Sequence, residues 1–214
     1  MYRILLFFAL LLLSCTEEKV ELPVIPQEGI TGVYNTSNIW IFFKIQQGDT
    51  LASVNSKNKI ANTHLIFHID KKLQMKHIVP ELVAIQNKLQ EKTMHKIEGM
   101  KNYMSYADPK NKTYALVDFT NTRYSLEDRV SRPDTIKYDL LDLCQKEFVL
   151  RDSTYPLPDL ELKLKELLAD TAHIRPLALK FCETLTFDQY LYTKSLLQKH
   201  RIDTDNTEII YSKK

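Results

Sequence analysis

Apolar and polar positions form two patterned stretches along the chain. In the first, about residues 38–124, the run NIWIFFKI, the turn signal QQGD and the run TLASV predict a β-hairpin. HLIFHID predicts a third strand, and MKNYMSYA and TYALVDFT predict two more around the turn signal DPKNK. A helical pattern follows the third strand, and Pro80 is expected in its first turn, where proline is tolerated. The apolar positions of this helix are Ile78, Leu82, Ile85 and Leu89.

The second stretch, about residues 134–212, begins with two predicted strands, TIKYDLLDL and EFVLRDSTYPL. An amphipathic helix is predicted over PDLELKLKELLAD, and RPLALKFC alternates like a strand. Thr186 and Gln189 fit a capping box that opens a second helix, and TEIIYS predicts the last strand. The order is β-β-α-β-α-β, so we expect an α+β fold of two small mixed blocks. One side of the first helix is expected to carry Leu160, Leu164, Leu167 and Leu168.

The chain begins with an uninterrupted apolar run from Ile4 to Leu13, preceded by Arg3. A helix over this run would rise about 15 Å, half of the roughly 30 Å hydrocarbon core of a bilayer. The run is therefore too short to span a membrane and is typical of a secretory signal. Residues 15–37 are polar and broken by prolines and glycines, which predicts a tether.

The end of the apolar run, Leu12-Leu13-Ser14-Cys15, resembles a bacterial lipobox. This resemblance implies that residues 1–14 are a lipoprotein signal peptide and that Cys15 is lipidated. The alternative is an ordinary signal peptide with a chance cysteine. Acidic residues directly after Cys15 resemble the surface-export signals of some bacterial lipoproteins. The expected location is the bacterial cell envelope, with the protein anchored by lipid and facing the periplasm or the cell surface.

Composition narrows the classes of function. Lys and Arg number 29 against 27 Asp and Glu, so the chain has no electrostatic footprint for nucleic acid, and no nucleic-acid partner is expected. The last of the four glycines is Gly99. The glycine-rich loops that bind phosphates and the GxSxG nucleophile elbow are absent from the sequence, which argues against a nucleotide enzyme or a serine hydrolase of that type.

The cysteines and histidines offer little for a metal. Export permits a disulfide between Cys144 and Cys182, and the alternative is two small buried residues in neighbouring strands. No CxxC pair or Cys/His pair with metal spacing is present in the sequence. His64 and His68 are four residues apart, which on a strand separates them by about 13 Å. No metal and no cofactor are expected.

Other candidates for chemistry lack a supporting motif. Nothing in the sequence places the acid pairs in a cleft or raises a pKa, so solvated surface charge explains them better than general acid–base catalysis. The serines have no nucleophile motif, and the expectation is a protein that is not an enzyme. The groups considered are Glu127 with Asp128, Asp139 with Asp142, and Ser153 and Ser195.

Aromatic residues gather near the end of the first stretch. They are explained either by a core with one exposed tyrosine or by a platform on which a sugar or a peptide stacks. They are Tyr103, Tyr106, Tyr114, Phe119 and Tyr124.

The segment PLALKFCETLTFDQYLYTKSLLQKHRI and the element order around it resemble the periplasmic domain of the ExbD/TolR biopolymer-transport family. Glu183 stands where the family often carries aspartate, and Arg201 stands where it often carries glycine before an isoleucine, here Ile202. The resemblance covers residues 134–212. It implies a homodimer, and contact with energy-transducing or outer-membrane transport proteins or with peptidoglycan.

The departure from the family lies at the beginning of the chain. Members of the motor type carry an aspartate in an N-terminal transmembrane helix, whereas the run from Ile4 to Leu13 contains no acid. The resemblance therefore implies a lipid-anchored accessory of a biopolymer or nutrient transport system that does not itself couple proton flow. The alternative is a lipoprotein that binds peptidoglycan or another ligand and has no connection with transport. The first stretch shows a similar strand–helix pattern, and the sequence leaves open whether it is a diverged repeat of the second.

Overall fold

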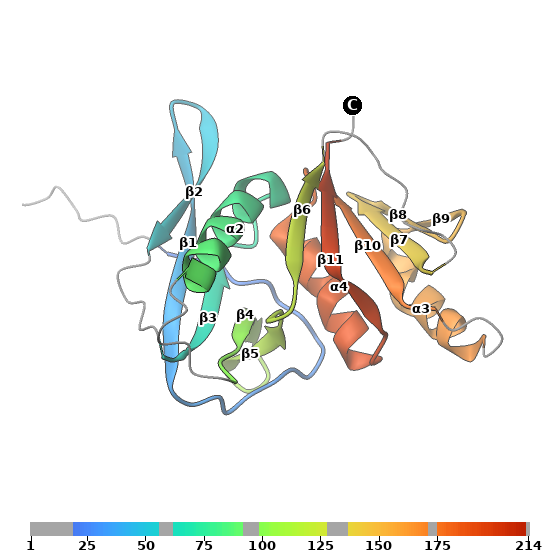
Figure 1. Ribbon diagram of the computed structural model, residues 1–214, viewed down its shortest axis with the longest axis horizontal. Coiled ribbons are helices and arrows are strands. Elements are labelled where there is room, and N and C mark those ends of the chain that lie inside the picture. The colour runs from blue at the N-terminus through green and yellow to red at the C-terminus, as the bar shows by residue number, and fades with distance from the viewer. Residues whose placement is uncertain (1–18, 56–61, 92–98, 128–136, 171–174, 213–214) are drawn as a thin grey trace, which may run out of the picture.

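The computed structural model describes residues 19–55, 62–91, 99–127, 137–170 and 175–212. The fold is α+β, as predicted, with two mixed sheets that lie side by side and helices packed on them (Figure 1). Each sheet is built mainly from one of the two predicted stretches, and we call the two parts the first half and the second half. The boundary falls between Asp118 and Arg123, because the strand that begins at Arg123 belongs to the second sheet.

The first half is a five-stranded sheet in the order β2-β1-β3-β4-β5, and helix α2 connects β3 to β4. Strands β1, β3 and β4 are parallel, whereas β2 and β5 are antiparallel hairpin partners at the two edges. The elements are β1 (Thr36–Gln46), β2 (Asp49–Asn55), β3 (His64–Ile69), α2 (Met75–Glu91), β4 (Asn102–Asp108) and β5 (Thr113–Asp118).

The second half is a six-stranded sheet in the order β6-β11-β10-β7-β8-β9. Strands β6, β11, β10 and β7 are parallel, and β8 and β9 continue the sheet in antiparallel pairs. The elements are β6 (Arg123–Glu127), β7 (Asp139–Cys144), β8 (Glu147–Leu150), β9 (Ser153–Pro156), the 3-10 turn η2 (Leu157–Asp159), α3 (Leu160–Ala169), β10 (Leu177–Cys182), α4 (Phe187–Lys199) and β11 (Thr204–Tyr211).

The two halves share one arrangement of strands. The neighbours β2-β1-β3-β4 correspond to β8-β7-β10-β11, with an antiparallel hairpin on one side and a parallel strand–helix–strand unit on the other. Helix α2 corresponds to α4. Strands β5 and β6 occupy the next position in each sheet. They differ in direction, because β5 is antiparallel to β4 whereas β6 is parallel to β11. The first half is thus a topological repeat of the second without counterparts of β9, η2 and α3 among the described residues.

Three details of the second half and of α2 differ from the predictions. The expected strand EFVLRDSTYPL is divided into β8 and β9, because Arg151 adopts a left-handed conformation (φ 57°) at the turn between them. Leu168 is 42% exposed although it was expected on the buried side of α3. Pro80 lies inside α2 and not in its first turn, since the helix begins at Met75.

The segment expected as part of a polar tether is packed against the first half where the structure describes it. Its side chains alternate in burial, and Pro23, Ile25 and Gln27 are buried. The amide of Ala107 donates to Pro23 O at 2.7 Å, and Ile30 pairs with β5. We call residues 19–30 the N-terminal segment. Prolines interrupt regular secondary structure, but they leave an extended chain free to bury every second side chain.

Candidate functional site

The two halves meet where β3 and β10 turn into the helices α2 and α4. Gln74 and Thr186 form an isolated antiparallel bridge at this point. Thr186 also caps α4, because its hydroxyl accepts the Gln189 amide while the Gln189 side chain accepts the Thr186 amide, as the predicted capping box requires. The contact between the halves is therefore built by the first turns of two helices.

The hydrogen bonds on either side of this bridge are reciprocal. Each amide at the start of one helix donates to a carbonyl of the other turn, and the equivalent amide of the other helix donates back. The bonds are Met75 N to Leu185 O at 2.9 Å, Phe187 N to Leu73 O at 2.7 Å, Lys76 N to Glu183 O at 2.9 Å, and Asp188 N to Lys71 O at 3.3 Å. This is the pattern of an isologous contact around a two-fold axis, here within one chain. It also satisfies amides that have no partner within their own helix.

A second pair of reciprocal contacts lies at the far end of the helices. The Gln86 side chain of α2 donates to Thr122 O at 2.9 Å, and the Gln198 side chain of α4 accepts the Asp118 amide at 3.2 Å. Both partners flank the connection between β5 and β6. Helix α2 also contacts β6, and α4 contacts β5, so each helix packs against the edge strand of the other sheet (Figure 1). We call this whole contact the seam.

The second half carries a buried polar network beside the seam. Tyr190 of α4 donates to Glu208 of β11 at 2.8 Å, and its hydroxyl lies 3.1 Å from that of Tyr124. Lys194 pairs with the other oxygen of the Glu208 carboxylate, which is 1% exposed. Burial raises the pKa of both tyrosines, so both stay protonated. The reciprocal seam bonds match Met75 with Phe187, so Tyr190 and Lys194 correspond to Ile78 and Leu82 in the first half. The strand registers match Glu208 with Met104, so all three counterparts are apolar.

The central strands carry a further buried polar residue at equivalent positions. His68 of β3 is 3% exposed and Lys180 of β10 is fully buried. The His68 ring stacks on Trp40 with centroids 4.1 Å apart, whereas the Lys180 ammonium lies 5.2 Å from the ring centroid of Tyr211. Burial lowers the pKa of both groups, to about 4 for His68. Tyr211 in turn donates to Asp142 at 2.8 Å.

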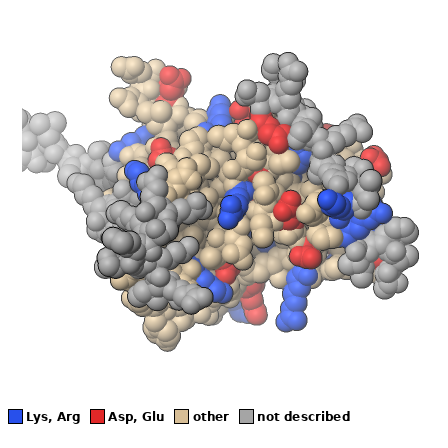
Figure 2. Space-filling model, viewed as in Figure 1, with Lys and Arg blue, Asp and Glu red and all other residues tan. Residues whose placement is uncertain are grey.

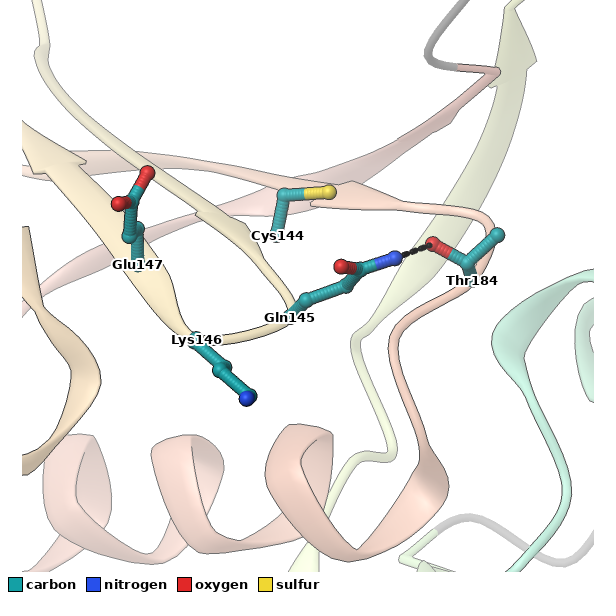
Figure 3. A pocket seen from close by; sticks show the side chains of 5 residues that line it. All are labelled: Cys144, Gln145, Lys146, Glu147 and Thr184. Carbon is teal, nitrogen blue, oxygen red and sulfur yellow. Dashed lines mark hydrogen bonds between the residues drawn. The ribbon is translucent and has the colours of Figure 1, made fainter.

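A pocket of about 490 Å³ lies beside the hairpin that joins β7 and β8. Figure 3 shows the Gln145 amide reaching toward Thr184, to which it donates at 3.4 Å, while Lys146 and Glu147 point to opposite sides of the turn. Cys144 lies in its wall and is joined to Cys182 by a disulfide with Cα atoms 5.0 Å apart. The bridge fixes the end of β7 to the end of β10, which leads into the seam. The pocket is lined by polar and charged side chains without a catalytic arrangement among the residues described.

Of the other candidates from the sequence, Glu127 at the end of β6 and Glu183 line one pocket, and the other described ones are spread over the second half. Glu183 directly follows β10, and its carboxylate accepts the Ser212 hydroxyl at 2.8 Å. Asp139 pairs with Arg151, on the strand that also carries Asp142. Ser153 is exposed at the start of β9, and Ser195 is buried and donates to a carbonyl of its own helix. Cys15 and Asp128 lie outside the described residues.

The histidines of β3 bind protein groups. His64 accepts the Lys101 amide, and His68 contacts Ser105 and Asn38. Among the residues that the structure describes, no three His, Cys, Asp or Glu side chains are grouped so as to hold a metal. In the same part of the chain, no helix is both long enough and apolar enough to cross a membrane.

The aromatic residues of the first stretch are mostly core. Tyr103, Tyr106 and Phe119 are at most 5% exposed, and Tyr124 belongs to the buried network, whereas Tyr114 is 39% exposed. This is a core with one exposed tyrosine. Charged side chains of both signs are interspersed over the face shown in Figure 2. The seam itself was missed by sequence reasoning, because it is made of main-chain atoms from turns far apart in the chain.

Comparison with protein-family models, with curated proteins and with solved structures finds no match for this chain.

Proposed function

We propose that this protein is a non-enzymatic, lipid-anchored protein of the bacterial envelope that acts by contact with other proteins, in or beside a biopolymer or nutrient transport system. The observation that carries the proposal is the reciprocal seam. The ExbD/TolR resemblance implies a domain that works as a pair, and two units of like topology paired within one chain agree with that implication.

The N-terminal segment adds a constraint on where the partner lies. Glu21 forms ion pairs with Lys71 and Lys72 on the body of the first half. If Cys15 carries the lipid, the six residues from it to Glu21 reach about 20 Å at most. The folded part is then held close to its membrane and not on a long tether. A protein partner is expected in, or directly at, the same membrane.

The test is crosslinking in cells with a C-terminally tagged copy, followed by mass spectrometry of the captured proteins. We expect an energy-transducing protein, its channel subunit or an outer-membrane receptor. A Cys15→Ser variant is the matched control, because it keeps the fold and should lose both cleavage of the precursor and the captured partners. Capture of this protein alone, or of wall fragments, would contradict the transport proposal.

Binding of peptidoglycan or another ligand is the second candidate. Half-buried Trp40 and exposed Tyr114 flank His68 on the first sheet. The ring centroids of His68 and Tyr114 are 5.4 Å apart. Aromatic rings of this kind stack on sugars as well as on peptides. Retention on isolated peptidoglycan that is lost in a Tyr114→Ala variant would favour this candidate over transport.

A further inference from the structure

A second pocket, which we call the seam pocket, lies between α2 and the ends of β6 and β11. Its volume is about 240 Å³. Its apolar lining residues include Pro80 of α2, Leu126 of β6 and Ile210 of β11, and its charged lining residues are Lys76, Glu127 and Glu183. Leu126 is 59% exposed, and its side chain is one of the most exposed large apolar groups that the structure describes.

The repeat of topology identifies what lies at the equivalent place in the first half. In the reciprocal seam bonds, Glu183 takes the place of Lys71, and Lys76 takes the place of Asp188. Four residues further along each helix, Pro80 therefore corresponds to Tyr192. The strand registers, in which Phe67 pairs with Met104 and Leu179 with Glu208, relate Ile210 to Tyr106 and Tyr211 to Ala107. Four residues that line the seam pocket therefore have counterparts in the first half: Lys71, Tyr192, Tyr106 and Ala107.

All four counterparts contact the N-terminal segment. The amide of Lys71 donates to Glu21 O at 2.8 Å, and that of Ala107 donates to Pro23 O at 2.7 Å. Tyr106 donates to Gln27 O at 2.9 Å. The Gln27 side chain also lies near the Tyr192 hydroxyl. The place that the seam pocket occupies in the second half is thus filled in the first half by an extended piece of this chain.

We propose that the seam pocket binds an extended segment of a partner protein that places a basic side chain near Glu183 and a branched apolar side chain between Pro80 and Leu126. The apolar part of the proposal follows from the first half, where Ile25 of the N-terminal segment is buried to 3% exposed. Strand β6 is an edge of its sheet, and an extended segment is the kind of ligand that a sheet edge accepts.

The charge of the segment follows from a reversal between the halves. Glu21 binds Lys71 and Lys72, whose hydrogen bonds lower the pKa of its carboxyl to about 2. The counterpart of Lys71 is the acid Glu183, and that of Lys72 is the neutral Thr184. A basic residue is therefore expected where the N-terminal segment has an acidic one. The same reversal argues against a second copy of residues 19–28 as the occupant, because Glu21 would face Glu183.

The mode of binding differs in one respect from that in the first half. The amide of Glu183 donates to Tyr211 O at 2.8 Å, so β10 and β11 remain paired to their ends. In the first half, β3 and β4 separate after Phe67 and Met104, and the N-terminal segment enters between them. The partner segment is therefore expected to lie on the apolar lining of the seam pocket and along β6, and not between the two central strands.

The test uses the full chain and two fluorescent peptides of residues 19–28, one with the native sequence KVELPVIPQE and one with Glu21→Lys. We expect the Glu21→Lys peptide to bind about tenfold more tightly in anisotropy titrations, which corresponds to about 1.4 kcal/mol. Glu183→Lys should reverse the preference, and Leu126→Asp should weaken binding by about tenfold or more. Leu162→Asp is the matched control, since Leu162 is 56% exposed on α3, and it should leave binding unchanged.

Absence of binding by both peptides, or binding that Leu126→Asp leaves intact, would overturn the proposal. A dimer in sedimentation that Leu126→Asp dissociates would also overturn it, because the pocket would then belong to a second copy. The inference deepens the proposed function by naming the kind of segment contacted. If the peptides fail to bind, only the seam pocket is refuted as a binding site. If no partner is captured in cells, the proposed function by protein contact is itself refuted.

Discussion

Protonation of His68 should destabilise the protein, and the structure allows the size of the effect to be worked out. The neutral ring is fully bonded, since Nε2 donates to Asn38 and Nδ1 accepts the Ser105 hydroxyl. Burial lowers its pKa from 6.5 to about 4. Between these values the unfolded chain binds a proton that the folded chain does not bind. The free energy of unfolding therefore falls as the pH falls through this window, and the contribution is complete above pH 6.5.

The expected loss is about 3 kcal/mol, from 1.36 kcal/mol for each unit of pKa. Stacking of an imidazolium on Trp40 would return about 0.5–1 kcal/mol, so we expect a net loss of about 2–3 kcal/mol at pH 4 relative to pH 7.5. His68→Gln keeps a polar side chain without a titrating group. The acids titrate in both proteins, so the difference between wild type and variant isolates His68.

The assay is urea unfolding followed by circular dichroism at intervals between pH 7.5 and pH 4. The fluorescence of Trp40, which is the single tryptophan, reports on the stacked ring in the same samples. The wild type should lose about 2–3 kcal/mol more than His68→Gln over this range. If the free energy of unfolding depends equally on pH in the two proteins, the reasoning is refuted. It is also refuted if the wild type alone becomes more stable on going from pH 7.5 to pH 4.

Three further predictions concern stability. Removal of the disulfide by Cys144→Ala with Cys182→Ala should lower the free energy of unfolding by about 4 kcal/mol, because it opens a loop with a sequence separation of 38; a loss below about 1 kcal/mol in urea titrations would contradict this. Lys194→Met should lower the free energy of unfolding by about 3 kcal/mol, because it leaves Glu208 buried without its cation. Adding Glu208→Met should recover most of this stability, whereas additive losses in a double-mutant cycle would argue against the ion pair. Gly29→Ala would place a Cβ against the buried Tyr106 hydroxyl and should cost about 1–3 kcal/mol; an unchanged melting temperature would show that the N-terminal segment does not pack there.

Periodicity located most of the strands and helices, although the central strands β3 and β10 are buried along nearly their whole length and not on one face only. Strand β6 was not predicted. RYSLE alternates polar and apolar residues, but it is only five residues long, and it forms a strand by pairing with β11, which lies at the far end of the chain. Helix α2 began earlier than expected for a similar reason. Its first amides, at Met75 and Lys76, find acceptors in the other half, so the helix extends well before Pro80.

The candidate site was less accessible to sequence reasoning than the fold. Cys144 and Cys182 were visible as a pair, but the position of their bridge beside the turn into α4 depends on the strand order. The N-terminal segment looked like a tether because prolines and a glycine interrupt it. The sequence has no periodic signal that could have corrected this, because the apolar Val24 is exposed and the polar Gln27 is buried.

The reciprocal seam has a consequence for stoichiometry. A symmetric homodimer presents every surface twice, so a single substitution alters two sites and a saturating ligand binds in a ratio of two to each pair. Here the paired units are covalently continuous, and each can change alone: one has the apolar trio of Ile78, Leu82 and Met104 where the other has a charged network. Titration of a monomer of this chain should therefore saturate at one partner segment per chain. A substitution outside the seam should therefore alter one side of the pseudo-two-fold axis and leave the other side unchanged.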